Sequence, residues 1–310
     1  MLADAHCHFF SPGFFRALAA DLNQPAADDE DPAGALPRSL GWDAPGSDEE
    51  LADRWCAELD RHQVDRAMLI ASVPGDEASV AAAARRHPDR VAGAFMFNPA
   101  SDSRSRLEHA FIELGLRTVC LFPAMHRVPI DDDRSGAVFE TAAKHGRAVF
   151  VHCGALSIGI RKKLGLPSRF DLRLGDPLAA ASMAVWFPGV PVIIPHFGAG
   201  LFRETLMAAQ SAPNIVLDTS SSNDWVRLVG GLTLRDVFAR ALDVLGPERL
   251  MFGTDSSFFP RGWQRGIHDI QRAILEDLGV ASAAQALIFG GNFARLFGGR
   301  PAAPPDGVQQ

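Results

Sequence analysis

Tyrosine is absent from this 310-residue sequence, and lysine, with three residues, and cysteine, with four, are scarce. Four cysteines are too few for a disulfide framework, and they lack the Cys-x-x-Cys spacing of many structural zinc sites. The missing tyrosine removes one common general acid from consideration. No apolar run approaches the roughly 20 residues that a membrane span needs. These absences exclude a disulfide-rich scaffold and a membrane-spanning protein.

The sequence also lacks an excess of basic residues. It has 37 acidic and 30 basic residues, a net charge of −7, so it carries no electrostatic signature of nucleic-acid binding. The first residues have neither the basic nor the apolar region of a signal peptide. We therefore expect a cytoplasmic globular protein that acts on a small molecule, with no nucleic-acid or membrane partner. The segment 279–297 offers a surface for a homodimer, which the sequence does not decide.

Short apolar runs alternate along the chain with longer, helix-like segments. This alternation predicts a parallel sheet, and eight repeats at this length predict a closed (β/α)8 TIM barrel. An open doubly wound sheet is the alternative, but no glycine-rich phosphate loop follows the first strand. We expect one domain over residues 1–298, long loops at 11–47 and 158–174 after strands 1 and 5, extra C-terminal helices, and a disordered tail at 299–310. The predicted strands are 1–8, 66–71, 91–97, 118–122, 148–152, 190–196, 215–218 and 250–255.

Polar side chains with metal-binding chemistry stand at the carboxyl ends of four predicted strands. His6 and His8 end the first strand and, two residues apart, point to the same face. His152, His196 and Asp255 end strands 5, 6 and 8. Because the active site of such a barrel lies at the carboxyl ends of its strands, we expect these side chains to meet.

A single histidine is more often a hydrogen-bonded structural residue than a ligand. Four histidines and one aspartate at four strand ends are harder to explain in that way. Gathering a carboxylate and several imidazoles at one mouth is unfavourable without a metal ion or a proton-transfer role. The cluster therefore favours a metal-dependent or acid–base site.

The opening Asp4-Ala5-His6-Cys7-His8 resembles the first-strand motif of the amidohydrolase superfamily, and the ordered His152, His196 and Asp255 complete that pattern. Further motifs resemble the amidohydrolase-related branch, which includes aminocarboxymuconate-semialdehyde decarboxylase-like enzymes. The resemblance extends from Asp4 to Phe297. Its further motifs are Pro88-Asp89-Arg90, Pro195-His196-Phe197-Gly198, the segment 214–220, Gly253-Thr254-Asp255 and the segment 291–297.

The resemblance implies that His6, His8, His152 and Asp255 ligate one divalent metal ion. His196 would then be the acid–base or substrate-polarising group, with Asp255 as the second catalytic residue. Binuclear members of the superfamily use a carboxylated lysine at the end of strand 4, and no lysine stands there in this chain. A mononuclear site with three imidazoles, one carboxylate and an open position suits Zn²⁺, with Mn²⁺ as the alternative.

Two activities fit this ligand set. The first is hydrolysis of an amide, lactone or related carbonyl compound by activated water, and the second is decarboxylation of an unsaturated or aromatic acid. A basic loop after strand 5 favours an anionic substrate. A non-catalytic metal-binding or small-molecule-binding barrel is the third reading. The substrate-binding candidates are Arg38, Trp42, Arg169 and Trp225.

Overall fold

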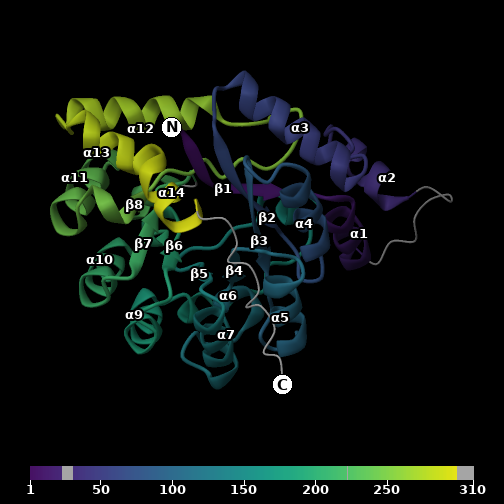
Figure 1. The fold of residues 1–310 in the computed structure, drawn as a ribbon, viewed down its shortest axis with the longest axis horizontal. Coiled ribbons are helices and arrows are strands. Elements are labelled where there is room, and N and C mark those ends of the chain that lie inside the picture. Colours follow the sequence, from purple (N-terminus) through teal and green to yellow (C-terminus); the bar gives the residue numbers. More distant parts are fainter. Residues whose placement is uncertain (23–30, 222, 299–310) are drawn as a thin grey trace, which may run out of the picture.

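Eight parallel strands form one sheet whose neighbours follow the order of the sequence, as the computed structural model shows for residues 1–22, 31–221 and 223–298 (Figure 1). Helices alternate with the strands and surround them, so the structure confirms the predicted TIM barrel. The strands are β1 (Ala3–Phe9), β2 (Arg66–Ala71), β3 (Val91–Met96), β4 (Thr118–Leu121), β5 (Ala148–Val151), β6 (Val192–Ile194), β7 (Ile215–Asp218) and β8 (Leu250–Met251).

The barrel closes between β1 and the short strand β8. The Asp255 amide donates to the His6 carbonyl at 2.9 Å, and the His8 amide donates to the Ser256 carbonyl at 2.7 Å. An isolated parallel bridge joins Cys7 to Ser256. Closure thus places the segment that carries Asp255 directly beside the two histidines of β1.

Alternation along the strands separates two buried layers. The barrel interior holds small or slender residues such as Ala94 and Ala148 together with Met68 and Phe150. The larger layer between the barrel and its helices combines helix side chains such as Trp55 with the outward-facing strand side chains. This separation is expected because successive side chains of a strand point to opposite faces.

The helices begin at clear capping residues. Ser47 and Glu50 form a reciprocal capping box at the start of α3, as the sequence predicts. The α-helices of the described residues are α1 (Pro12–Asp21), α2 (Pro32–Ser39), α3 (Asp48–Arg61), α4 (Glu77–Arg86), α5 (Arg104–Ile112), α6 (Pro123–His126), α7 (Asp133–Lys144), α8 (Gly159–Lys163), α9 (Pro177–Trp186), α10 (Phe202–Ser211), α11 (Leu234–Leu245), α12 (Arg265–Asp277), α13 (Ser282–Ala286) and α14 (Asn292–Phe297).

The long segments after strands 1 and 5 contain more helix than the sequence analysis assigned to them. The first carries α1 and α2, and the second carries α8. Ser11 caps α1 just before Pro12, and Asp31 caps α2 just before Pro32. A capping residue followed by proline marks the start of a helix. The amide N–H of the first helical residue has no partner within the helix, so proline, which has no N–H, loses nothing at that position.

The C-terminal helices cover the amino-terminal end of the barrel. Phe293 and Phe297 of α14 pack into the interior cluster, and Figure 1 shows α14 in front of the strands, near the N-terminus. This leaves the opposite end, where the strands finish, as the location of the polar cluster. No helix in the described parts of the chain is long and apolar enough to cross a membrane. The predicted tail, 299–310, lies outside the described residues.

Candidate metal centre

A bulge in β1 turns both of its histidines into the barrel. The pairing of β1 with β2 shifts register between Asp4 and Cys7, so these two residues both face outward although they are three apart. His6 and His8 therefore face inward, and the His6 ring packs against Phe150 of the interior at 5.2 Å. Bulges often re-aim side chains next to active sites in this way.

His6, His8 and Asp255 form a three-residue cluster with metal-binding geometry. One ligand atom from each lies within 4.8 Å of the other two. The Asp255 Oδ1 atom is 3.1 Å from His8 Nε2 and 3.8 Å from His6 Nε2. The predicted convergence of strands 1 and 8 is thus present in the structure.

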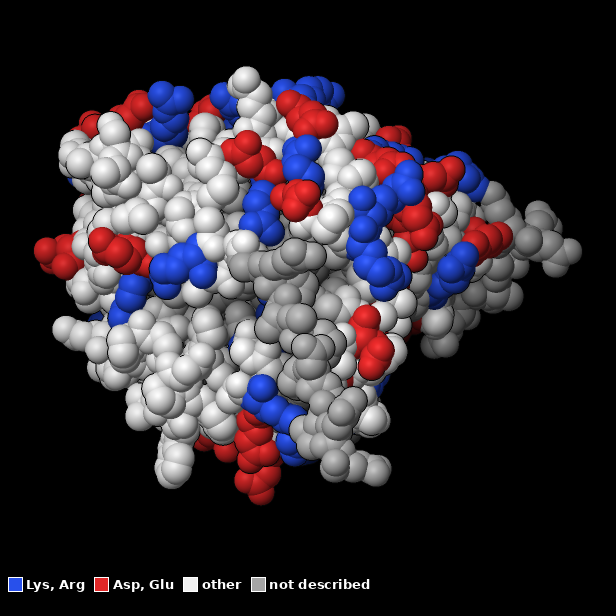
Figure 2. All heavy atoms as spheres, in the orientation of Figure 1, with Lys and Arg blue, Asp and Glu red and all other residues white. Residues whose placement is uncertain are grey.

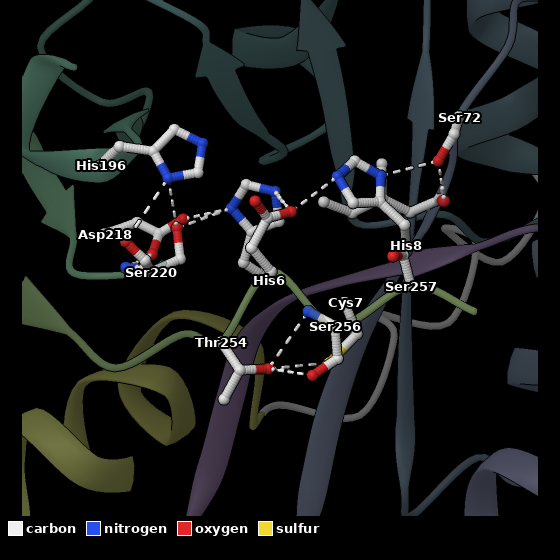
Figure 3. A network of polar contacts seen from close by, with 12 residues as sticks. His6, Cys7, His8, Ser72, His196, Asp218, Ser220, Thr254, Ser256 and Ser257 are labelled. Atoms are coloured by element: carbon white, nitrogen blue, oxygen red, sulfur yellow. Dashed lines mark hydrogen bonds and ion pairs between the residues drawn. The ribbon is translucent and has the colours of Figure 1, made fainter. Parts of the chain in front are cut away.

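Hydrogen bonds behind the cluster fix which ring nitrogen of each histidine faces Asp255 (Figure 3). His6 Nδ1 donates to Asp218 Oδ2 at 2.6 Å. Ser72 Oγ uses its proton on the Ile70 carbonyl at 3.0 Å, so it accepts from His8 Nδ1 at 2.7 Å. Both Nε2 atoms then present lone pairs toward Asp255. Three acceptors that face one another need a cation between them, and a backing carboxylate or hydroxyl is the usual support of metal-binding histidines.

The charges around His6 also favour a cation. Burial alone lowers the pKa of His6, but the Asp218 carboxylate, with help from Asp255, raises this pKa to about 9. Burial raises the pKa of Asp255, but the histidines beside it, His8 first, hold this pKa well below the usual range. The site therefore attracts positive charge, which a divalent ion supplies in place of a proton.

His152 lies near this cluster but outside the three-residue group. Its ring centroid is 5.4 Å from that of His196, and it stacks on Phe122 at 5.3 Å. Burial lowers its pKa far below the ordinary value, so its imidazole is neutral. Its buried Nδ1 has no hydrogen-bond partner among the described residues. A neutral imidazole with an unsatisfied buried nitrogen fits a further metal ligand.

His196 is linked to His6 through Ser220. The Ser220 hydroxyl lies 3.1 Å from His6 Nδ1 and 2.9 Å from His196 Nδ1. Since His6 Nδ1 uses its one proton on Asp218, it accepts nothing from Ser220, and the Ser220 hydroxyl can donate its own proton to His196 Nδ1. This assignment leaves a proton on His196 Nε2. Burial lowers the pKa of His196, which keeps the ring neutral.

His196 and Asp255 both adopt left-handed backbone conformations. Their φ angles are 55° and 59°, a region that residues other than glycine rarely occupy. Each such residue costs about 1–3 kcal/mol unless its surroundings hold it. The carbonyl of Asp255 is held by Arg261 at 3.3 Å and Gln264 at 3.4 Å, and its amide by His6. The strain coincides with two candidate catalytic residues.

A fully buried carboxylate ties the two closing strands together. Asp4 accepts from the His6 amide at 2.9 Å, from Thr254 Oγ1 at 2.5 Å and from Trp263 Nε1 at 2.7 Å. Burial raises the pKa of Asp4, although these hydrogen bonds oppose the rise. The network fixes His6 and the segment before Asp255 in one unit. Sequence reasoning noted Asp4 only as part of a motif and assigned it no role.

Asp218→Asn is expected to weaken metal binding by about 10- to 100-fold, the usual effect of removing such a supporting group. The substitution removes a negative charge, and an amide nitrogen facing His6 Nδ1 would force the tautomer that cannot bind a metal through Nε2. Competition with a chelator measures the affinity. Asp224→Asn is the matched control, because Asp224 is exposed on the neighbouring segment. Equal affinities of the two variants would contradict a supporting role for Asp218.

A cavity of about 620 Å³ opens beside the cluster at the carboxyl ends of the strands. Ser72, the hydrogen-bond partner of His8, contributes to the lining of the cavity. The lining does not include the three residues of the cluster, nor His152 and His196. Its size lies within the range of small-molecule sites. The wall is mostly apolar, with arginines from the segments after β4 and β5.

The four substrate-binding candidates lie in different environments. Arg169 lines the cavity. Trp42 is buried and stacks on Phe258 at 3.8 Å, while Trp225 is buried and donates to Asn223 at 3.1 Å. Arg38 is exposed on α2. Of the four, the described structure brings Arg169 alone to the cavity wall.

The comparison with protein families agrees with this site. A family model described as amidohydrolase matches residues 3–299. The chain belongs to this amidohydrolase family. The match covers the whole barrel with its closing helices, so the family resemblance in the sequence is confirmed. No curated protein sequence matches this chain significantly.

Solved structures share the fold of this chain over almost its full length. A 5-carboxyvanillate decarboxylase from Sphingomonas paucimobilis aligns with a TM-score of 0.65 at 19% identity, covering 96% of this chain and 98% of the other. An amidohydrolase from Burkholderia multivorans with bound zinc gives 0.63 at 15% identity, with 96% and 99% covered. A probable 2-pyrone-4,6-dicarboxylic acid hydrolase from Acinetobacter baumannii gives 0.58 at 14%, also with 96% and 99% covered. At these identities the likeness concerns the fold.

Proposed function

We propose that this amidohydrolase is a metal-dependent hydrolase that cleaves an amide, lactone or related carbonyl bond of an anionic small molecule. The observation that carries the proposal is the orientation of His6 Nε2, His8 Nε2 and Asp255 Oδ1 toward one point, with both Nδ1 atoms engaged behind. His152 completes the proposed ligand set. Zn²⁺ suits these ligands best, and Mn²⁺ is the alternative. A zinc ion bound in a structural neighbour supports this choice.

Each residue then has a distinct task. A bound divalent cation would supply Lewis-acid activation of water and of the carbonyl group. Asp255, ionised because its pKa is lowered, accepts the proton of the attacking water. His196 donates from Nε2 to the carbonyl oxygen or to the leaving group, held in position by Ser220 at Nδ1.

Decarboxylation is the second candidate activity. It is favoured by the arginines beside the metal centre, which suit a carboxylic acid, and two of the structural neighbours are decarboxylases. In this reading the same cluster binds the acid, and His196 delivers the proton that replaces the carboxyl group. The two activities share the residues but differ in their products.

Isotope labelling distinguishes these activities. Metal-loaded protein is incubated in ¹⁸O-water with panels of lactones, amides and aromatic acids, and the products are analysed by mass spectrometry. We expect one solvent oxygen in an acid product, and no such product with Asp255→Asn. Release of CO₂ without oxygen incorporation would establish the decarboxylase instead. Absence of both, with metal bound, would favour a binding protein.

A further inference from the structure

We infer that the substrate is an amphipathic acid, with an apolar body in the cavity beside His8 and an anionic group at Arg169. This inference rests on the proposed function, because it assumes that the reaction takes place at the neighbouring metal centre. It adds a chemical class to that function: a hydrophobic carboxylate rather than a polyhydroxylated compound. The cavity wall and the pairing of its charged residues carry it.

The wall of the cavity offers almost no hydrogen bonds to a neutral polar ligand. Its apolar lining comes from the end of β3 and from the segments that follow β1, β2, β4 and β5. Ser72 is the sole uncharged polar residue in the described lining, and its hydroxyl already serves His8 and the Ile70 carbonyl. A ligand with many hydroxyl groups would lose its hydrogen bonds to water without replacement. The apolar wall includes Phe14, Leu18, Val73, Met125, Ile160 and Phe170.

The charged residues of the lining leave a net positive charge. Three arginines face one aspartate, Asp21, whose carboxylate is bound by Arg161 at 2.6 Å. Arg127 donates to the backbone carbonyl of Arg169 at 2.9 Å, and the carboxylate that feels its charge, Asp171, does not line the cavity. Positive charge in an otherwise apolar cavity selects an anionic ligand.

Arg169 differs from most arginines of the surface. On the face shown in Figure 2, basic and acidic side chains lie next to one another. Many exposed arginines pair with a carboxylate, as Arg86 does with Asp53 at 2.6 Å. The guanidinium of Arg169 makes no ion pair or hydrogen bond with any described residue. It is exposed, so it stands on the solvent side of the cavity, whereas the half-buried Ser72 stands on the side of His8. An acid bound between them would place its apolar body along the wall.

Calorimetric titration of the metal-loaded protein with three probes tests the inference. The probes are 4-phenylbutyrate, its neutral amide 4-phenylbutanamide, and the polyhydroxylated acid gluconate. We expect 4-phenylbutyrate to bind at least about tenfold more tightly than either of the others. Arg169→Gln should reduce this preference for the carboxylate over the amide to about twofold or less. Leu18→Asp should weaken both phenyl compounds.

Arg173→Gln is the matched control, because Arg173 is 87% exposed, pairs with Asp171 at 2.6 Å and does not line the cavity. Thermal unfolding of each variant checks that it folds. Tighter binding of gluconate, or an unchanged preference in Arg169→Gln, would overturn the inference. The inference would also be overturned if removal of the metal abolished binding of 4-phenylbutyrate while Arg169→Gln left this binding unchanged. The carboxylate would then bind at the metal and not at Arg169. The proposed function fails separately, if no solvent oxygen enters any product while the phenyl acid still binds.

Discussion

Replacing His6 and His8 together by alanine is expected to leave the protein without its metal ion and without measurable turnover. The wild-type chain should hold about one Zn or Mn per molecule. Two of the three ligand atoms that lie within 4.8 Å of one another disappear in the variant, and the two remaining proposed ligands, His152 and Asp255, are too few to retain a divalent ion. Elemental analysis of the purified proteins measures the metal, and the labelling assay measures turnover.

Two further variants make this result specific. His8→Ala removes a ligand whose side chain is 20% exposed, whereas loss of His6 leaves the buried Asp218 without its partner at 2.6 Å. The single variant therefore separates loss of the metal from loss of folding. His109→Ala, on the exposed side of α5, is the matched control and should keep both metal and turnover. One ion per chain in the double variant would contradict the proposed ligands. Two ions in the wild type would contradict a mononuclear site.

The alternation of apolar runs and helical segments was sufficient to predict the barrel. A parallel strand must be followed by a crossover, and eight such units at this length leave few other architectures. The meeting of His6, His8 and Asp255 followed from the same reasoning, because the strands of a closed barrel end at one mouth. These features depend on periodicity and order, which are visible in a sequence.

The supporting residues were not predicted, because they depend on register. Asp218 and His6 are 212 positions apart, and their hydrogen bond exists only because the barrel closes with one particular stagger. The bulge in β1 is equally hidden: strict alternation from Ala3 and Ala5 would have turned His6 outward. Ser72 and Ser220 stand just after strand ends and carry no periodic signal. A polar residue within two positions of a strand end is the clue that would have identified them.

The loop residues show why substrate contacts are harder to predict than ligands. Trp42 and Trp225 looked like loop aromatics free to touch a substrate, but the structure buries both among other side chains. Loop segments have no fixed period, so their side-chain directions depend on tertiary packing. Arg169 differs from these two tryptophans because it lines the cavity as predicted. A charged side chain is rarely buried without a partner, so its exposure is easier to predict.

His196→Asn is expected to lower kcat by about 10²- to 10⁴-fold while leaving the metal content near one ion per chain. The range is that of a lost general acid or base. Asparagine suits the position because it tolerates the left-handed backbone better than most residues, and the φ of His196 is 55°. Its short amide can still reach the Ser220 hydroxyl, but it has no group at the place of Nε2. The comparison of kcat with metal content therefore isolates the distal nitrogen.

The combination of outcomes decides what His196 does. Ser220→Ala should keep the imidazole but release its Nδ1, so we expect a smaller loss of kcat, about tenfold, with unchanged metal content. A metal-free His196→Asn protein would make His196 a ligand and would transfer the acid–base role elsewhere. Turnover within twofold of the wild type would remove His196 from the reaction. A large loss in His196→Asn with a small loss in Ser220→Ala is the pattern that a proton-donating Nε2, oriented by a hydroxyl at Nδ1, must produce.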